Sequence, residues 1–188
     1  MTELADLLDW KAFLDQHIDD YPEPFKRFMT EFLLCEASMG RGATGYAYRN
    51  YYELVRRHGT LRQQAFIIPD DPTFESMELG QCYYNSFNGA VELGLQYVEG
   101  YAMTDLTVVP HAWLEDEEGT IIDATWAKLG LPIDFQVTYF GVKFERDFVI
   151  ERADATDHCA VLGSDYLVHS PILRFGLTFK DDIAVGLA

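Results

Sequence analysis

The chain has 188 residues, 48% of them hydrophobic and 14% aromatic, and it carries 14 Lys and Arg against 31 Asp and Glu. This composition favours a packed globule over a disordered acidic chain, and a formal charge of −17 repels nucleic-acid phosphates and anionic membrane surfaces. We therefore expect one domain over residues 1–188, with no nucleic acid and no membrane as partner.

The cysteines give no sign of a disulfide framework or a metal site. Cys35, Cys82 and Cys159 are widely spaced without a CxxC motif, which suits a reducing compartment. Together with Cys159, the histidines His158 and His169 do not follow the ligand spacing of a common metal site. The first 20 residues are acidic, unlike a signal peptide, and no apolar run is long enough for a membrane span. We expect a cytoplasmic protein without metal or other cofactor.

Residues 1–60 have the pattern of a helical part. Apolar side chains recur at helical spacing over residues 4–18, 25–33 and 46–58. Residues 40–45 spell GxGxxG, but a dinucleotide site needs a strand before this motif and an acid about 20 residues after it. Neither is present, so a loop between two helices is the better interpretation.

Residues 61–188 are richer in strand-like runs. These runs are residues 65–68, 107–109, 120–122, 135–144, 148–150, 166–168 and 172–179. Between them, residues 83–95 have apolar side chains on one helical face. The second part is therefore predicted to combine one helix with a sheet.

Cys82 opens that predicted helix, two residues after Gly80. At a helix N-terminus the free backbone N–H groups and the positive end of the helix dipole favour thiolate over thiol. The same N–H groups could stabilise a developing oxyanion. The alternative is that Cys82 is a small buried hydrophobic residue, as free cysteines often are.

His111 and Asp123 flank an acidic turn at residues 115–119, between two strand-like runs. In a hairpin centred on Glu117 they are directly opposed, with Cβ atoms about 4.5–5.5 Å apart. A slip of one residue would put them on opposite faces. Together with Cys82 they have the order and setting of a thiol nucleophile, its base and an orienting carboxylate.

Four segments, GQCYYNS, YVEGYA, PHAWLEDEEGTIIDATW and TYFGVKF, resemble the Cys–His–Asp cores of the papain-like and transglutaminase-like superfamily. Small bacterial and phage proteins of uncharacterised function are particularly similar. The resemblance covers residues 80–144, about a third of the chain. It implies an α+β fold in which the cysteine helix packs on an antiparallel sheet that carries histidine and aspartate. It also implies thiol acyl-transfer chemistry.

The group that completes the oxyanion hole is less clearly marked. Papain-type proteases carry a glutamine shortly before the cysteine, and the corresponding residue here is Ser76. Glu99 lies in an apolar stretch, where it either faces the cleft or needs a buried partner. The candidates for oxyanion or substrate contacts are Gln81, Gln64, Asn85, Glu99 and Trp113, besides the backbone N–H groups.

These features predict a cysteine hydrolase that cleaves an amide bond in a protein or peptide through Cys82, His111 and Asp123. The thioester intermediate would be resolved by water, or by an amine in a transglutaminase-like transfer. The alternative is a noncatalytic binding protein on the same fold, a phage or bacterial factor that sequesters a basic host protein.

Overall fold

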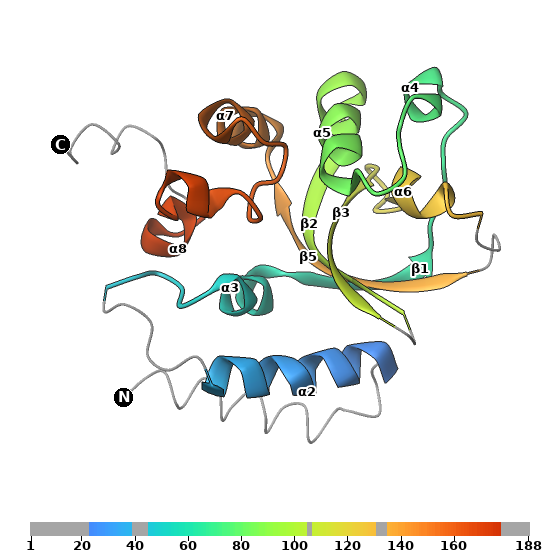
Figure 1. Ribbon diagram of the computed structural model, residues 1–188. Helices are drawn as coiled ribbons and strands as arrows, with labels where there is room; N and C mark the ends of the chain where they lie inside the picture. The colour runs from blue at the N-terminus through green and yellow to red at the C-terminus, as the bar shows by residue number, and fades with distance from the viewer. Residues whose placement is uncertain (1–22, 39–44, 105–106, 131–134, 178–188) are drawn as a thin grey trace.

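The computed structural model describes residues 23–38, 45–104, 107–130 and 135–177 (Figure 1). The helices are α2 (Glu23–Ser38), α3 (Tyr51–His58), α4 (Pro72–Glu75), α5 (Cys82–Leu93), α6 (Ala124–Ala127), α7 (Arg146–Thr156), the 3₁₀ helix η2 (Asp165–Val168) and α8 (Pro171–Phe175). The strands are β1 (Thr60–Ala65), β2 (Gln96–Met103), β3 (Val108–Glu115), β4 (Ile121–Ile122) and β5 (Gln136–Phe144). The helix predicted over residues 4–18 lies outside the described residues, as does the 40–45 loop apart from Gly45.

The five strands form one antiparallel sheet in the order β1-β5-β2-β3-β4, which confirms the predicted α+β class and the antiparallel sheet. The sheet curls until its two edges meet. Ile67, just after β1, forms a bridge with Ile122 in β4, and the Gln64 amide donates to the Gly119 carbonyl at 3.4 Å. The curl gives the sheet an enclosed inner face and an outer face.

Two paired glycines allow β2 and β5 to approach closely. Gly100 lies opposite Gly141 in the register of these strands. A Cβ atom on Gly100 would overlap the Phe140 carbonyl, and one on Gly141 would overlap the Trp113 ring. A side chain at either position is therefore excluded where the backbones meet.

The two faces of the sheet have separate apolar clusters, because side chains alternate along each strand. The inner cluster consists of Val98, Ala102, Trp113, Ile121, Val137 and Tyr139. The outer cluster joins side chains such as Leu114 and Phe140 to the helices. In α5, a Cβ atom on Gly89 would overlap Leu114 Cδ1, so this helix packs directly on the outer face. The Phe25 ring of α2 lies 5.3 Å from the Phe140 ring, so α2 covers the same face. In Figure 1, α5 lies above the curled sheet and α2 and α3 lie below it, because the outer face turns with the curl.

Several strands predicted in the C-terminal part are wrong. Residues 148–150 belong to α7, residues 166–168 to η2, and residues 172–175 to α8. Short apolar runs do not distinguish a strand from a buried helix face, and α7 buries residues one turn apart, Val149 and Arg152. Pro171 occupies the first turn of α8, where its missing N–H costs no hydrogen bond.

Two predicted boundaries also shift. The helix predicted over residues 46–58 begins at Tyr51, because Asn50 caps it by accepting a bond from the Glu53 N–H at 2.9 Å. The strand predicted at 65–68 is instead Thr60–Ala65, followed by the single Ile67 bridge. Among the helices of the described ranges, none is long and apolar enough to cross a membrane.

Candidate active site

Cys82 is the first residue of α5, as predicted. It is partly exposed, and its N-cap residue Gln81 makes no side-chain capping bond. The first turn of α5 holds no acidic residue. The first backbone hydrogen bond of the helix runs from the Asn85 N–H to the Gln81 carbonyl, at 2.8 Å. The N–H groups before Asn85 have no intrahelical acceptor, so the sulfur lies where the backbone is most positive.

The Asn85 side chain fixes the chain around this N-terminus. Its Oδ1 accepts from the Glu78 N–H at 3.1 Å, and its Nδ2 donates to the Glu78 carbonyl at 2.7 Å and to Thr125 Oγ1 at 2.8 Å. The loop before α5 and helix α6 are thereby both tied to α5. Both Asn85 amide protons are donated within the fold, so these bonds do not support the predicted oxyanion contact of Asn85.

His111 and Asp123 form the close pair that the sequence predicts, in a different register. Strands β3 and β4 pair Leu114 with Ile122, so the hairpin is centred on Glu118 instead of Glu117. A shift of two residues preserves the face of each side chain, and the two become diagonal neighbours. His111 Nε2 lies 2.6 Å from Asp123 Oδ2, and both side chains are buried.

The Asp123 carboxylate is held by four donors. As N-cap of α6, its Oδ1 accepts from the N–H groups of Thr125 and Trp126, both at 3.1 Å. Its Oδ2 accepts from the Tyr139 hydroxyl at 3.0 Å in addition to the His111 ring. A buried carboxylate needs such partners to stay ionised. Tyr139 is a site residue that the sequence does not mark, since alternation along β5 shows only that it shares a face with Val137, two residues away.

The pKa of His111 is set by opposing influences. Burial lowers it, but the charge of Asp123 and hydrogen bonds to Asp123 and Cys82 raise it from 6.5 to about 9. Because Nε2 is bonded to Asp123, Nδ1 is the ring nitrogen left for Cys82. The imidazole is therefore protonated at neutral pH, beside the sulfur.

Aromatic rings surround the His111 imidazole. The Trp113 ring lies nearly parallel to it, at 14° and 6.4 Å, and the partly exposed Trp126 meets it edge-on at 5.9 Å. Trp113 is only 1% exposed and also packs on Tyr139 at 4.9 Å. Trp113 therefore supports the imidazole from inside the sheet and leaves almost no surface for the predicted substrate contact.

The two glutamine candidates separate. Gln64 uses its amide to close the sheet against the β3–β4 turn, so its predicted oxyanion role is not supported. Gln81 is exposed next to Cys82 and lines a pocket of ≈ 390 Å³. Ser76, at the position of the papain-type glutamine, donates to the Thr73 carbonyl at 2.8 Å. Gln81 is thus the one predicted oxyanion side chain that the structure leaves beside the sulfur.

Glu99 has the buried partners that a structural acid requires, and it also lines a pocket. It accepts from the N–H groups of Val161, Leu162 and Gly163 at 2.6, 3.1 and 2.8 Å. The Tyr97 hydroxyl adds a fourth bond at 2.9 Å. Burial raises the Glu99 pKa above its usual value, while these donors oppose the rise. Its side chain is on the outer face, the opposite face from the His111 ring.

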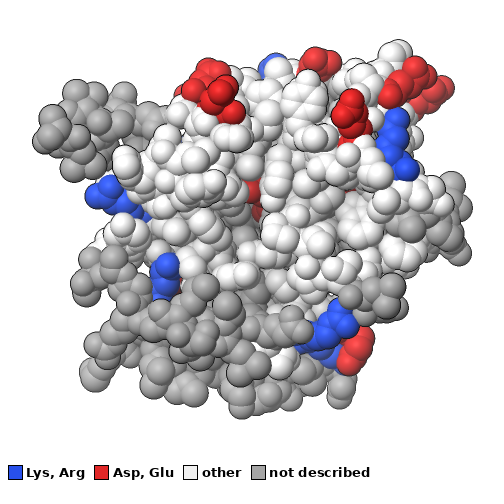
Figure 2. All heavy atoms as spheres, in the orientation of Figure 1, with Lys and Arg blue, Asp and Glu red and all other residues white. Residues whose placement is uncertain are grey.

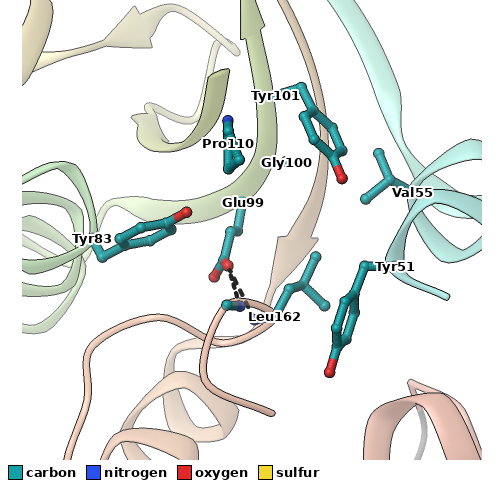
Figure 3. A pocket seen from close by; sticks show the side chains of 9 residues that line it. Tyr51, Val55, Tyr83, Glu99, Gly100, Tyr101, Pro110 and Leu162 are labelled. Atoms are coloured by element: carbon teal, nitrogen blue, oxygen red, sulfur yellow. Dashed lines mark hydrogen bonds between the residues drawn. The ribbon is translucent and has the colours of Figure 1, made fainter. Parts of the chain in front are cut away.

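Two adjoining pockets lie beside the Cys82 helix. The one of ≈ 200 Å³ contains Glu99 (Figure 3), and the one of ≈ 390 Å³ contains Gln81. Tyr83 and Gly163 line both. Figure 2 shows atoms of an acidic residue recessed between uncharged residues near the middle of the face in view. Among the residues that the structure describes, no group of three or more His, Cys, Asp or Glu could hold a metal ion.

Comparison with protein-family models, with curated protein sequences and with solved structures finds no match to this chain. The resemblance of residues 80–144 to papain-like and transglutaminase-like cores therefore stays a prediction.

Proposed function

We propose that the protein is a thiol-dependent acyl-transfer enzyme that hydrolyses an amide bond in a protein or peptide. One observation carries the proposal: Asp123 holds the His111 ring at 2.6 Å, and the interaction of that ring with Cys82, at the N-terminus of α5, contributes to the raised His111 pKa. Nucleophile, base and orienting carboxylate in this sequence of contacts are the groups that thiol acyl transfer needs.

In the proposed reaction, the Cys82 sulfur attacks the amide carbon while His111 holds the thiol proton. His111 then gives this proton to the leaving amine as the C–N bond breaks, which leaves a thioester on Cys82. Water attacks the thioester and gives a proton to His111, the C–S bond breaks, and the acid product leaves with the sulfur anion and the protonated His111 restored. Asp123 keeps the imidazole oriented through its hydrogen bond to Nε2.

The oxyanion formed in each step would be stabilised by the Cys82 N–H and the Gln81 side-chain amide. The N–H belongs to the first helical residue and has no intrahelical acceptor. Gln81 is exposed and adjacent, without a capping bond to hold it elsewhere. Replacing Gln81 with Ala should lower kcat about 100- to 1000-fold, the range for loss of one oxyanion donor.

The test is the pH dependence of Cys82 alkylation by iodoacetamide, with Cys35 and Cys159 replaced by serine. We expect reaction at about pH 6, because the raised pKa of His111 keeps a cation beside the sulfur, which also lies at the N-terminus of α5. His111→Ala should abolish this acidic reactivity, and His158→Ala, a histidine on an exposed loop, should leave it unchanged. Reaction that begins only near pH 8.5, the ordinary thiol range, would contradict the proposal.

A noncatalytic binding protein is the second candidate function. It is supported by exposed apolar side chains at the larger pocket, where Tyr166 is 65% and Tyr84 54% exposed. Such side chains favour contact with a partner surface. A binding protein needs no activated thiol, so the alkylation experiment distinguishes the two candidates.

A further inference from the structure

The pocket around Glu99 lies beside the N-terminus of α5, whose first residue is Cys82. It is lined by Tyr51, Val55, Tyr83, Glu99, Gly100, Tyr101, Pro110, Leu162 and Gly163. Tyr83, one of the wall residues, follows Cys82 in the chain, whereas Pro110 and His111 project from opposite faces of β3, so the pocket adjoins the nucleophile and not the imidazole. A side chain bound here would therefore belong to a residue close to the bond that Cys82 attacks.

The pocket contains a buried carboxylate, and no cation stands among the described residues that line it. Glu99 is 2% exposed, and its four partners are neutral: three backbone N–H groups and one phenol. None of the residues that line the pocket in the described part of the chain is Lys or Arg. A cationic ligand group would gain from this charge, whereas an anionic group would be repelled.

The walls suit a long side chain with a cationic end. Tyr51, Tyr83 and Tyr101 present aromatic rings, and Val55 and Leu162 present aliphatic groups (Figure 3). The Tyr83 hydroxyl points toward Glu99 and makes no hydrogen bond within the described residues. Burial raises the Tyr83 pKa, so the phenol stays protonated, with a lone pair for an ammonium or guanidinium donor.

We propose that this pocket receives a lysine or arginine side chain of a peptide substrate and makes the enzyme specific for cationic residues beside the cleaved bond. The inference rests on the proposed function and names its substrate class. The aliphatic stem packs on the apolar wall while the cation lies among the tyrosine rings, near Glu99. A chain of net charge −17 also attracts basic peptides from a distance.

Binding is measured on the Cys82→Ala variant, so that the result does not depend on turnover. Calorimetric titration compares N-acetyl-lysine methylamide with its norleucine and glutamate counterparts, and with free n-butylamine. We expect the lysine compound to bind about tenfold more tightly than norleucine, as one cation–π and charge contact would give. The glutamate compound should not bind, and n-butylamine should bind more weakly than the lysine compound because it lacks the peptide groups.

Substitutions then assign the preference to the pocket. Glu99→Gln should bring lysine and norleucine to within about twofold of each other. Glu118→Gln removes the same charge from an exposed turn and should leave the tenfold difference intact. Tyr83→Phe, which does not touch the bonds that Glu99 makes to residues 161–163, should weaken lysine binding severalfold, and Tyr84→Phe should not.

Norleucine binding as tightly as lysine, or no binding of either, would overturn the inference, even if Glu99→Gln fails to fold. Equal binding of n-butylamine and the lysine compound would overturn the peptide assignment in favour of a free amine ligand. Alkylation of Cys82 at acidic pH is read separately. If lysine is not preferred but Cys82 is alkylated at acidic pH, only the proposed specificity is refuted. If Cys82 is not alkylated at acidic pH, the proposed enzyme function is refuted.

Discussion

At the scale of single residues, the Asp123 carboxylate organises the candidate site. One oxygen caps α6 and the other receives the His111 ring and the Tyr139 hydroxyl, so a helix, a strand residue and the imidazole share one buried charge. Orientation of the imidazole and folding of this corner of the molecule therefore depend on the same group.

Asp123→Asn should lower the pKa of His111 from about 9 to below 6.5, because burial then outweighs the remaining attraction. The midpoint is measured from the imidazole proton shift in an NMR titration. Asp70→Asn, an exposed acid, serves as the control and should not move the midpoint. An unchanged midpoint in Asp123→Asn would show that Asp123 does not set the protonation of His111.

The same pair should make stability depend on pH. The folded pKa of about 9 lies above the unfolded value of 6.5, so the stabilisation is complete below about pH 6.5 and is lost as pH rises through 9. At 1.36 kcal/mol per pKa unit the loss is on the order of 3 kcal/mol. Urea unfolding between pH 6 and 10 measures it, and Asp123→Asn should flatten this part of the profile.

At the scale of secondary-structure elements, α5 is fixed by side-chain hydrogen bonds at its N-terminus and by close packing further along. Asn85 ties the preceding loop and α6 to it, and Gly89 leaves room for Leu114 of β3. Both contacts position the start of the helix against the sheet strand that carries His111.

Asn85→Ala should lower the free energy of unfolding by about 3 kcal/mol, because three hydrogen bonds are lost and buried partners are left without them. Denaturant unfolding measures the loss, and alkylation of Cys82 at pH 6 should slow as the N-terminus of α5 loosens. Asn88→Ala, on the same helix, should cost less than about 1 kcal/mol. Equal losses of unfolding free energy for Asn85→Ala and Asn88→Ala would show that the Asn85 side chain does not fix the N-terminus of α5.

At the scale of the whole molecule, the excess of acids should destabilise the folded state through self-repulsion. With 31 acidic and 14 basic residues, the chain carries a formal charge of −17. Salt screens this repulsion over a Debye length of about 10 Å at 0.1 M. The compact fold should therefore gain more from added salt than a neutral protein of this size would.

Raising sodium chloride from 10 to 300 mM at pH 7.5 should raise Tm by about 2–4 °C, the shift for roughly 1 kcal/mol in a chain of this length. Differential scanning calorimetry measures it. Near pH 4.4, the isoelectric point of the sequence, the same salt change should have little effect. A Tm that falls with salt at pH 7.5 would contradict the argument.

Local features of the site could be predicted because they depend on residues close in the chain. Gly80 and the apolar spacing after Cys82 indicate a helix N-terminus, and α5 begins there. His111 and Asp123 are an even number of residues apart across the hairpin, which indicates a shared face. They still share a face after the hairpin shifts by two residues. Side chains alternate with a period of two, so a shift of two residues keeps both on the same face. The shift does change which residues are directly opposed, and that part of the prediction is wrong.

What the sequence by itself determined is thus the helix that starts at Cys82 and the common face of His111 and Asp123, because caps, turns and alternation act between near neighbours. Only the tertiary structure decided that the Tyr139 hydroxyl reaches Asp123 and that Glu99 binds the N–H groups of residues 161–163. It also decided that residues 148–150 are helical. These outcomes depend on the curl of the sheet and on burial against distant segments, and no local pattern encodes which donors a buried carboxylate meets.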